Sequence, residues 1–178
     1  MAEKVITIFG TARAKQGERV YELAEQTGKL LAQAGFTIAN GGYGGTMLAA
    51  AKGAAEAGGG VIGVTCSVFG REANKYVSRE IVTGSLDERL DKLIKLGRGY
   101  VVLPGGTGTL LELAMVWELK NKGFLETGKP VILLGEFWKP LVRLIESDDL
   151  ESLRHIRIAA EPEQARDFLV DSLKNDDK

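Results

Sequence analysis

A glycine-rich segment, Pro104 to Glu112, has the residue types and spacing of an anion site. It follows a short apolar run, Tyr100 to Leu103, that predicts a buried strand, and it precedes an apolar-periodic run, Leu110 to Leu119, that predicts a helix. A turn of this kind gathers free backbone N–H groups and the positive end of the helix dipole, which favours a phosphate group. The contributing residues are Gly105, Gly106 and Gly108, which permit a close approach, and Thr107 and Thr109, whose hydroxyls can cap the helix or donate to an anion.

Glu112 is the unexpected member of this segment, because a carboxylate one turn into a phosphate-binding helix repels the phosphate. Two interpretations stay open. Thr109 and Glu112 have the spacing of a capping box, in which Glu112 is only a helix-start acid. Alternatively, Glu112 performs chemistry on another part of a phosphate-bearing ligand.

Arg89 is the second candidate for chemistry. It lies early in the run Leu86 to Leu96, which predicts a helix leading into the strand of the glycine turn. A helix that precedes a strand of a parallel sheet starts near the carboxyl end of that strand, so we expect Arg89 near Glu112. There an arginine can bind phosphate bidentately or orient a carboxylate. The alternative is a solvated arginine paired with Asp87 or Glu88.

Strand-like and helix-like runs alternate along the chain. Strands are predicted at Val5–Phe9, Phe36–Ala39, Val61–Val64, Glu80–Thr83, Tyr100–Leu103, Val131–Leu134 and His155–Ala159. Helices are predicted at Gly17–Ala34, Thr46–Ala57, Leu86–Leu96, Leu110–Lys120, Phe137–Ile145 and Glu163–Leu173, followed by a charged, frayed tail, Lys174–Lys178. This order predicts a single α/β domain over residues 1–178: one doubly wound, Rossmann-like parallel sheet with helices on both faces.

In such sheets, ligands bind beyond the carboxyl ends of the strands. Three glycine-rich segments fall at these ends, and their convergence predicts a nucleotide or phosphosugar site. Besides the turn at Gly105–Gly108, the predicted binding residues are Gly10 and Thr11 after the first strand and Gly42, Gly44, Gly45 and Thr46 after the second. The chain has neither the G-x-G-x-x-G dinucleotide fingerprint after its first strand nor a G-x-x-x-x-G-K-[ST] loop, which argues against a dehydrogenase or an NTPase.

Composition narrows the function classes further. The chain has 178 residues and a net charge of -1, with 23 basic and 24 acidic residues, so no broad basic field indicates nucleic acid. The single cysteine, Cys66, and the single histidine, His155, rule out an internal disulfide and leave few ligands for a soft metal. We expect Cys66 to be a small buried residue. With no apolar run of membrane-spanning length and no expected secretory leader, a cytoplasmic protein that binds no membrane is predicted.

The sequence Pro-Gly-Gly-x-Gly-Thr-x-x-Glu, from Pro104 to Glu112, resembles the hallmark motif of the Lonely Guy (LOG) family, whose members were formerly labelled lysine decarboxylases. In that family an arginine stands 15 residues before the motif proline, as Arg89 does here. The segment Gly41 to Met47 is similar to the family's second glycine loop, and Phe9 to Arg13 is similar to the first loop of longer bacterial members. Plant-type members commonly place a lysine after the arginine, where this chain has Leu90.

The resemblance, which spans roughly Val5 to Leu141, implies a phosphoribohydrolase. Such an enzyme hydrolyses the N-glycosidic bond of a nucleoside 5′-monophosphate, AMP or an N6-modified AMP of the cytokinin type, to the free base and ribose 5-phosphate. Arg89 and Glu112 would be catalytic, with Glu112 balancing the positive charge that develops on the ribose. The glycine loops would bind the nucleotide, and no metal or organic cofactor is implied. Met47 can reach the base, although packing in the core is favoured.

Two other functions stay open. Molybdenum-cofactor carrier proteins share the fold and similar loops, so a non-catalytic carrier of a phosphate-bearing ligand is the main alternative. A carrier does not need Arg89 and Glu112 together, and their joint presence favours the hydrolase. A nucleotide-sensing or nucleic-acid-linked module is disfavoured by the near-neutral net charge.

The resemblance also implies a homodimer or a higher homo-oligomer. The predicted helix after the motif carries more apolar residues than one buried stripe needs, which fits a second contact surface on a partner subunit. These residues are Leu113, Met115, Val116, Trp117 and Leu119.

Overall fold

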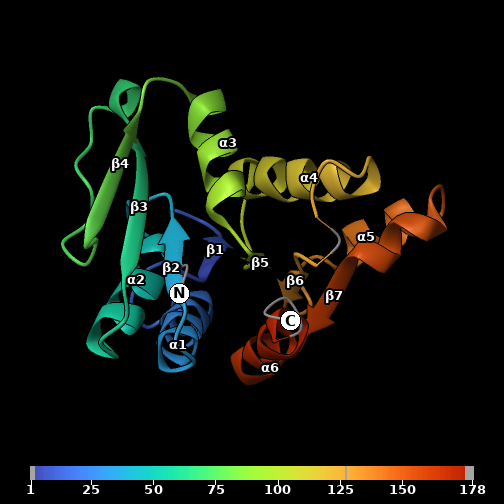
Figure 1. Cartoon of the computed structure of the whole chain (residues 1–178), viewed down its shortest axis with the longest axis horizontal. Coiled ribbons are helices and arrows are strands. Elements are labelled where there is room, and N and C mark those ends of the chain that lie inside the picture. The colour runs from blue at the N-terminus through green and yellow to red at the C-terminus, as the bar shows by residue number, and fades with distance from the viewer. Residues whose placement is uncertain (1–2, 127, 175–178) are drawn as a thin grey trace.

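The computed structural model describes residues 3–126 and 128–174, which form one parallel sheet flanked by helices (Figure 1). The strands are β1 (Val5–Phe9), β2 (Thr37–Asn40), β3 (Val61–Cys66), β4 (Arg79–Thr83), β5 (Gly99–Val102), β6 (Val131–Leu134) and β7 (Ile156–Ala159). The helices are α1 (Arg19–Gln33), α2 (Thr46–Glu56), α3 (Leu86–Leu96), α4 (Thr107–Asn121), α5 (Lys139–Glu146) and α6 (Pro162–Leu173), with 3-10 turns η1 (Ser67–Phe69) and η2 (Leu150–His155). The predicted α/β class with helices on both faces is therefore confirmed.

Each predicted strand and helix is present. The bounds of β1, α3 and β6 agree with the prediction to the residue, and the other elements begin or end one to three residues away. The predicted tail lies outside the described residues from position 175 onward.

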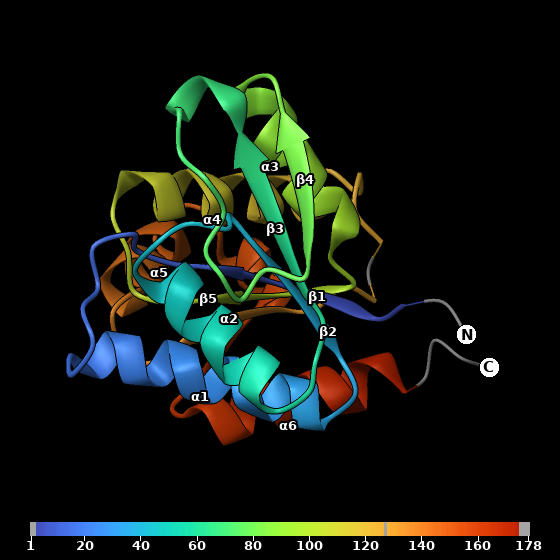
Figure 2. The same ribbon diagram turned by 90° about the vertical axis from the view of Figure 1, so that its left-hand side faces the viewer.

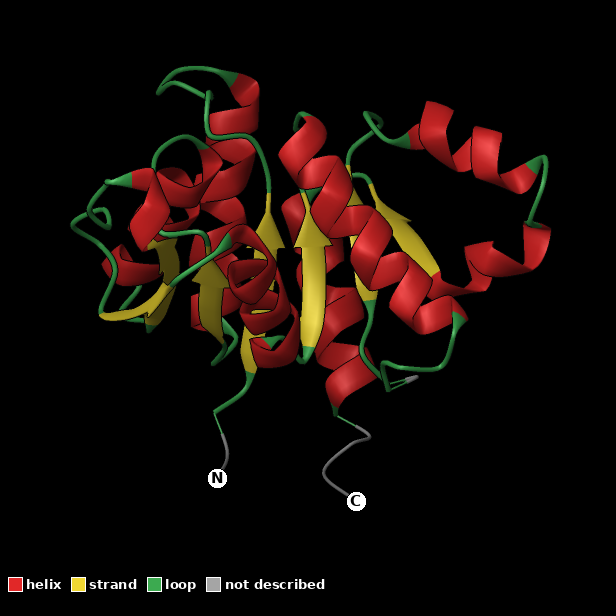
Figure 3. Cartoon of the chain, turned by 90° about the horizontal axis from the view of Figure 1, so that it is seen from above, coloured by secondary structure: helices red, strands yellow, loops and turns green. Residues whose placement is uncertain are grey.

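Strand residues alternate between two hydrophobic cores, one on each face of the sheet. Ile6 and Ile8 of β1 face the core beneath α1, α2 and α6, whereas Val5 and Phe9 face the core beneath α3, α4 and α5. Figures 1 and 2 show these two groups of helices on opposite sides of the strands, and Figure 3 shows the strands side by side among the helices. Burial on both faces explains why the strands are apolar at nearly every position.

The strand order, β4-β3-β2-β1-β5-β6-β7, reverses its direction of growth between β1 and β5. At this switch point the connections leaving two adjacent strands diverge, which opens a crevice at their carboxyl ends. The backbone N–H of Leu103 donates to the carbonyl of Phe9, and that of Thr11 donates to the carbonyl of Pro104. The first glycine loop and the glycine turn thus start side by side.

Within residues 3–126 and 128–174, no helix is long and apolar enough to cross a membrane.

Candidate functional site

A cavity of about 310 Å³ lies at the switch point, where the sheet topology predicts a ligand site. Eight of the residues singled out in the sequence line it: Gly10, Thr11, Arg89, Gly106, Thr107, Gly108, Thr109 and Glu112. The cavity therefore joins the N-terminal end of α4, where free N–H groups favour an anion, to the arginine and the glutamate.

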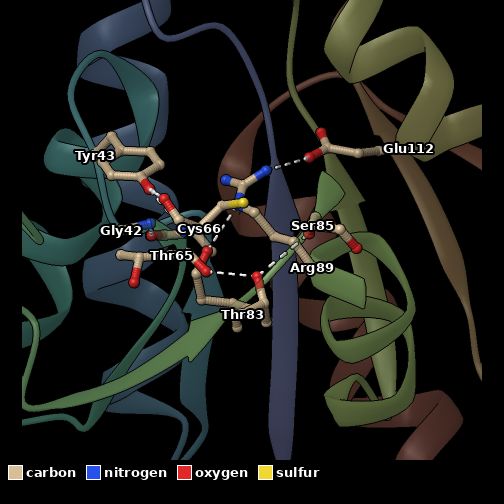
Figure 4. Close-up of polar contacts among 10 residues, drawn as sticks. Gly42, Tyr43, Thr65, Cys66, Thr83, Ser85, Arg89 and Glu112 are labelled. Carbon is tan, nitrogen blue, oxygen red and sulfur yellow. Dashed lines mark hydrogen bonds and ion pairs between the residues drawn. The ribbon is translucent and has the colours of Figure 1, made fainter. Parts of the chain in front are cut away.

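Arg89 and Glu112 approach each other across this cavity from α3 and α4. Nη1 of Arg89 lies 4.0 Å from Oε1 of Glu112. Figure 4 marks this ion pair with a dashed line between the two side chains. The Arg89 side chain is buried, with 8% of its surface exposed, and its Nε donates to the carbonyl of Val64 at 2.8 Å. The interpretation of Arg89 as a solvated helix arginine is therefore wrong.

The start of α3 explains how the sequence places Arg89 here. Ser85 is the N-cap, and its hydroxyl oxygen accepts from the N–H of Glu88 at 3.2 Å. The Glu88 carboxylate in turn accepts from the N–H of Gly84 at 2.6 Å, so it caps the helix and is not the partner of Arg89. These two bonds fix the first turn of α3, from which Arg89 extends toward β3.

Gly41 and two aromatic rings enclose the Arg89 guanidinium. A Cβ added at Gly41 would lie 1.7 Å from Nη2 of Arg89, so only glycine leaves room for the guanidinium. The guanidinium carbon lies 5.6 Å from the centre of the Tyr43 ring and 5.9 Å from that of Phe69, both within the range of cation–π attraction. The Tyr43 hydroxyl accepts from the N–H of Cys66 at 2.8 Å, which holds that ring in place.

Glu112 lies in the second turn of α4, which begins at Thr107 with Gly106 as its N-cap. Neither Thr107 nor Thr109 therefore occupies the capping position, and the capping-box interpretation of Thr109 and Glu112 is wrong. Thr109 instead packs against Gly105, where an added Cβ would lie 2.1 Å from its Oγ1. The helix begins earlier than its apolar periodicity indicates, because the glycine turn itself forms the first helical residues.

Burial raises the pKa of the Glu112 carboxyl to about 7, and the positive charge of Arg89 opposes part of that rise. Near neutral pH this carboxyl can therefore hold or release a proton. A buried acid with a displaced pKa beside an arginine is a typical feature of a catalytic site.

The second glycine loop supports the first loop from behind. The Thr46 hydroxyl donates to the carbonyl of Thr11 at 3.0 Å, and the Thr46 N–H donates to the same oxygen at 2.9 Å. Gly45 has φ +64° and lies so close that an added Cβ would be 2.3 Å from the Thr11 carbonyl oxygen. This contact explains why the start of α2 requires glycine.

Five predicted binding residues lie outside the cavity lining, namely Gly42, Gly44, Gly45, Thr46 and Gly105. Their contacts place Thr46 and Gly45 under the first loop and Gly105 under Thr109. None of these five lines the cavity, and their binding role, like that of Gly10, Thr11 and the α4 N-terminus, stays a prediction.

Sequence reasoning assigned no site role to five residues that line the cavity: Ala12, Arg13, Tyr43, Phe69 and Arg71. Met47 also lines it and is half-buried, in contrast to the favoured core position. Arg13 could have been identified from the sequence as a cavity residue, because it lies in the first glycine loop. Phe69 and Arg71 come from the segment after β3, which has no glycine signature and no regular periodicity.

The cavity has a positive lining. The lining contains three arginines, Arg13, Arg71 and Arg89, and one carboxylate, Glu112, and the N-terminal end of α4 adds its dipole. This charge distribution suits a ligand that carries a phosphate. Among the described residues, no group of three His, Cys, Asp or Glu side chains could hold a metal ion, and Cys66 is buried as expected.

The fold and the site define a Rossmann-like α/β protein with a buried arginine and a half-buried glutamate beside a glycine-rich turn at a helix N-terminus. The chain belongs to the SLOG cluster4 family, whose model matches residues 3–166, and the resemblance to LOG proteins is thereby confirmed.

Two relatives in sequence are named as phosphoribohydrolases, whereas a structural neighbour is named as a molybdenum cofactor carrier protein. The chain is 31% identical over 154 residues to a cytokinin riboside 5′-monophosphate phosphoribohydrolase of Rhodococcoides fascians, covering 83% of this chain and 77% of that protein. It is 34% identical over 133 residues to a protein of the same name from Mycobacterium tuberculosis, covering 72% and 69%. The molybdenum cofactor carrier protein of Chlamydomonas reinhardtii superposes with a TM-score of 0.79 at 29% identity, covering 97% and 99%.

Proposed function

We propose that this protein is a phosphoribohydrolase that cleaves the N-glycosidic bond of a nucleoside 5′-monophosphate to the free base and ribose 5-phosphate. The observation that carries the proposal is the half-buried Glu112 carboxyl, with a pKa of about 7, facing Arg89 across a cavity at the N-terminus of α4. The names of the two relatives support the same reaction.

The 5′-phosphate binds the N-terminal end of α4, where Gly106, Thr107 and Gly108 line the cavity. This anchor places the ribose beside Glu112, because the carboxylate extends from the second turn of the same helix. The phosphate thereby supplies positioning for a reaction that occurs elsewhere on the substrate.

Cleavage of the C1′–N bond leaves positive charge on the ribose, and the Glu112 carboxylate stabilises that charge. The same carboxylate takes a proton from the attacking water as its oxygen bonds to C1′. The electron pair of the broken bond goes to the base, which takes up one proton from solvent and leaves as the neutral base, while Glu112 returns its proton to solvent. Arg89 favours the charged form of the carboxyl and orients it.

A carrier of a phosphate-bearing ligand is the second candidate, favoured by the likeness to the Chlamydomonas protein. A carrier would use the N-terminus of α4 and the arginines. It would give no task to a buried carboxyl that is able to exchange a proton near pH 7, so the hydrolase explains more of the site.

The deciding experiment incubates the purified protein with AMP and with N6-isopentenyl-AMP and follows the free base by chromatography, with Glu112→Gln in parallel. Base release that is lost in Glu112→Gln supports the hydrolase, and the two rates rank AMP against a cytokinin-type substrate. Tight binding of a nucleotide without base release favours the carrier.

We also propose that two copies of the chain associate through α4. Leu113, Val116 and Trp117 of this helix are buried in the core, whereas Leu111 and Met115 lie one turn apart with 45% and 41% of their surface exposed. These two residues flank Glu112 in sequence, so a subunit seated on them would adjoin the site. Light scattering behind size exclusion should give a dimer, and Met115→Lys should give monomers.

A further inference from the structure

The 3-10 turn η1 presents a large apolar side chain to the cavity. Phe69, its last residue, lines the cavity with 44% of its surface exposed. Aromatic rings that stay accessible in a pocket are common contact groups for planar ligands.

The segment that carries Phe69 is tied to the sheet by hydrogen bonds. The N–H of Asn74 donates to the carbonyl of Gly42 at 2.7 Å, and the Asn74 side chain donates to the same oxygen at 3.1 Å. The Ser67 hydroxyl donates to the carbonyl of Thr83 at 3.2 Å. These bonds lie on both sides of Phe69 along the chain, so they anchor the backbone that carries its ring.

Part of the Phe69 ring is already in contact with protein. Its centre lies 6.0 Å from that of Tyr43, with the two planes tilted by 54°, and 5.9 Å from the guanidinium carbon of Arg89. The Tyr43 ring is buried, with 8% exposed. Of the two rings, Phe69 is therefore the one that a ligand can reach.

The groups of the site follow one another in a defined order. Glu112 lies five residues after the start of α4, about 7.5 Å along the helix axis. Nη1 of Arg89 follows at 4.0 Å from Oε1 of Glu112, and the ring centre of Phe69 follows at 5.9 Å from the Arg89 guanidinium carbon. A nucleoside 5′-monophosphate has its phosphate, ribose and base in the same order.

We propose that Phe69 is the base platform of the site: its accessible ring stacks on the planar heterocycle of a nucleoside 5′-monophosphate. This inference rests on the proposed function for the position of the phosphate. Stacking uses the π-face that every base has, so the platform binds the aromatic base as a class and tolerates an N6 substituent, which lies in the plane of the ring.

The test is calorimetric binding of two ligands, AMP and ribose 5-phosphate, to protein that carries Glu112→Gln so that AMP is not consumed. Phe69→Ala should weaken AMP binding by about 5- to 150-fold, the range for the loss of one stacked base. It should change ribose 5-phosphate binding by less than about twofold, because that ligand has no base to stack. Phe69→Tyr, which keeps a ring, should restore AMP binding.

Val68→Ala is the matched control. Val68 precedes Phe69 in η1 and is 73% exposed but does not line the cavity, so AMP binding should stay as in the parent. An equal loss for both ligands in Phe69→Ala would overturn the platform, because it would indicate an effect through Arg89 or the fold. Unchanged AMP binding in Phe69→Ala would overturn it as well.

The results expected if the proposed hydrolase function is wrong differ from those expected if the Phe69 platform is wrong. If the parent protein binds AMP in a Phe69-dependent way and yet the native protein releases no base, the platform stands and the hydrolase is overturned. If AMP does not bind at all, both are overturned.

Discussion

Nη1 of Arg89 and Oε1 of Glu112 are separated by 4.0 Å, which is longer than a direct hydrogen bond between groups of opposite charge. At this distance the arginine offsets only part of the effect of burial on the carboxyl, whose pKa stays at about 7. The pair is thus poised for proton exchange, in contrast to a tight structural ion pair that would hold the carboxyl fully ionised.

Because the pKa of Glu112 is raised, we predict that ionisation of its carboxyl destabilises the fold as the pH increases. The ordinary carboxyl pKa is 4.5, and the folded-state pKa is about 7, so folding takes up a proton between these values. Stability from this group is fully present below about pH 4.5 and is lost as the pH rises to about 7. Glu112→Gln removes the titrating group, so its effect on the free energy of unfolding should depend on pH. The change that it causes at pH 8 should be more stabilising than the change at pH 5 by on the order of 2 to 3 kcal/mol.

Chemical denaturation of both proteins at pH 5 and pH 8 measures this difference. Glu118→Gln is the matched control, because Glu118 lies on the same helix with an exposed side chain paired to Lys122. It should show no comparable dependence on pH. An equal effect of Glu112→Gln at both pH values would contradict the raised pKa.

The pH profile of base release should depend on Arg89. The carboxylate is the working form of Glu112, so the rate should rise with pH through about 7. Arg89 is the group that lowers the pKa of Glu112, and its removal in Arg89→Met should shift the rising limb to higher pH as well as slow the reaction. Arg89→Lys keeps the charge and should shift the limb less. If Arg89→Met lowers the rate but leaves the rising limb at the same pH, Arg89 does not influence the ionisation of Glu112.

Gly41 should be as sensitive to substitution as a residue that contacts the substrate. In Gly41→Ala the new Cβ meets Nη2 of Arg89 at 1.7 Å, so the guanidinium must move, and a displacement of about 1 Å in a catalytic group can reduce kcat about 100-fold. Steady-state kinetics should show the loss mainly in kcat. Gly44→Ala in the same loop should have less than about a twofold effect, because its Cβ would lie 3.8 Å from the Ala12 carbonyl oxygen, an ordinary contact. Equal losses in both variants would point to the loop and not to Arg89.

The sequence predicted the fold because the relevant signals are local. Apolar runs that are buried on both faces identify strands such as Val131–Leu134, and the capped amphipathic run Leu86–Leu96 identifies a helix to the residue. The position of Arg89 near Glu112 was also predictable, because chain direction in a parallel sheet determines where a helix begins.

The rest of the site depends on contacts between segments far apart in sequence. Glycines that touch a ligand and glycines that admit another loop look alike in a sequence, so the close packing of Gly45 against Thr11 could not be predicted. Phe69 was not found, because an exposed aromatic residue in an irregular segment has no periodicity to mark it. The position of α4 was predicted three residues too late, since Thr107 to Thr109 read as turn residues.

The support of the first loop by Thr46 should affect substrate binding without affecting the chemical step. In Thr46→Val the shape of the side chain is kept, but the hydroxyl bond to the Thr11 carbonyl is lost, which should reduce the free energy of unfolding by about 1 kcal/mol. Because Thr11 and Arg13 line the cavity, a looser loop should raise KM several-fold while kcat changes little. Thr46→Ser, which retains the hydroxyl, should restore KM. A fall in kcat at unchanged KM would instead place Thr46 among the groups that act on the transition state.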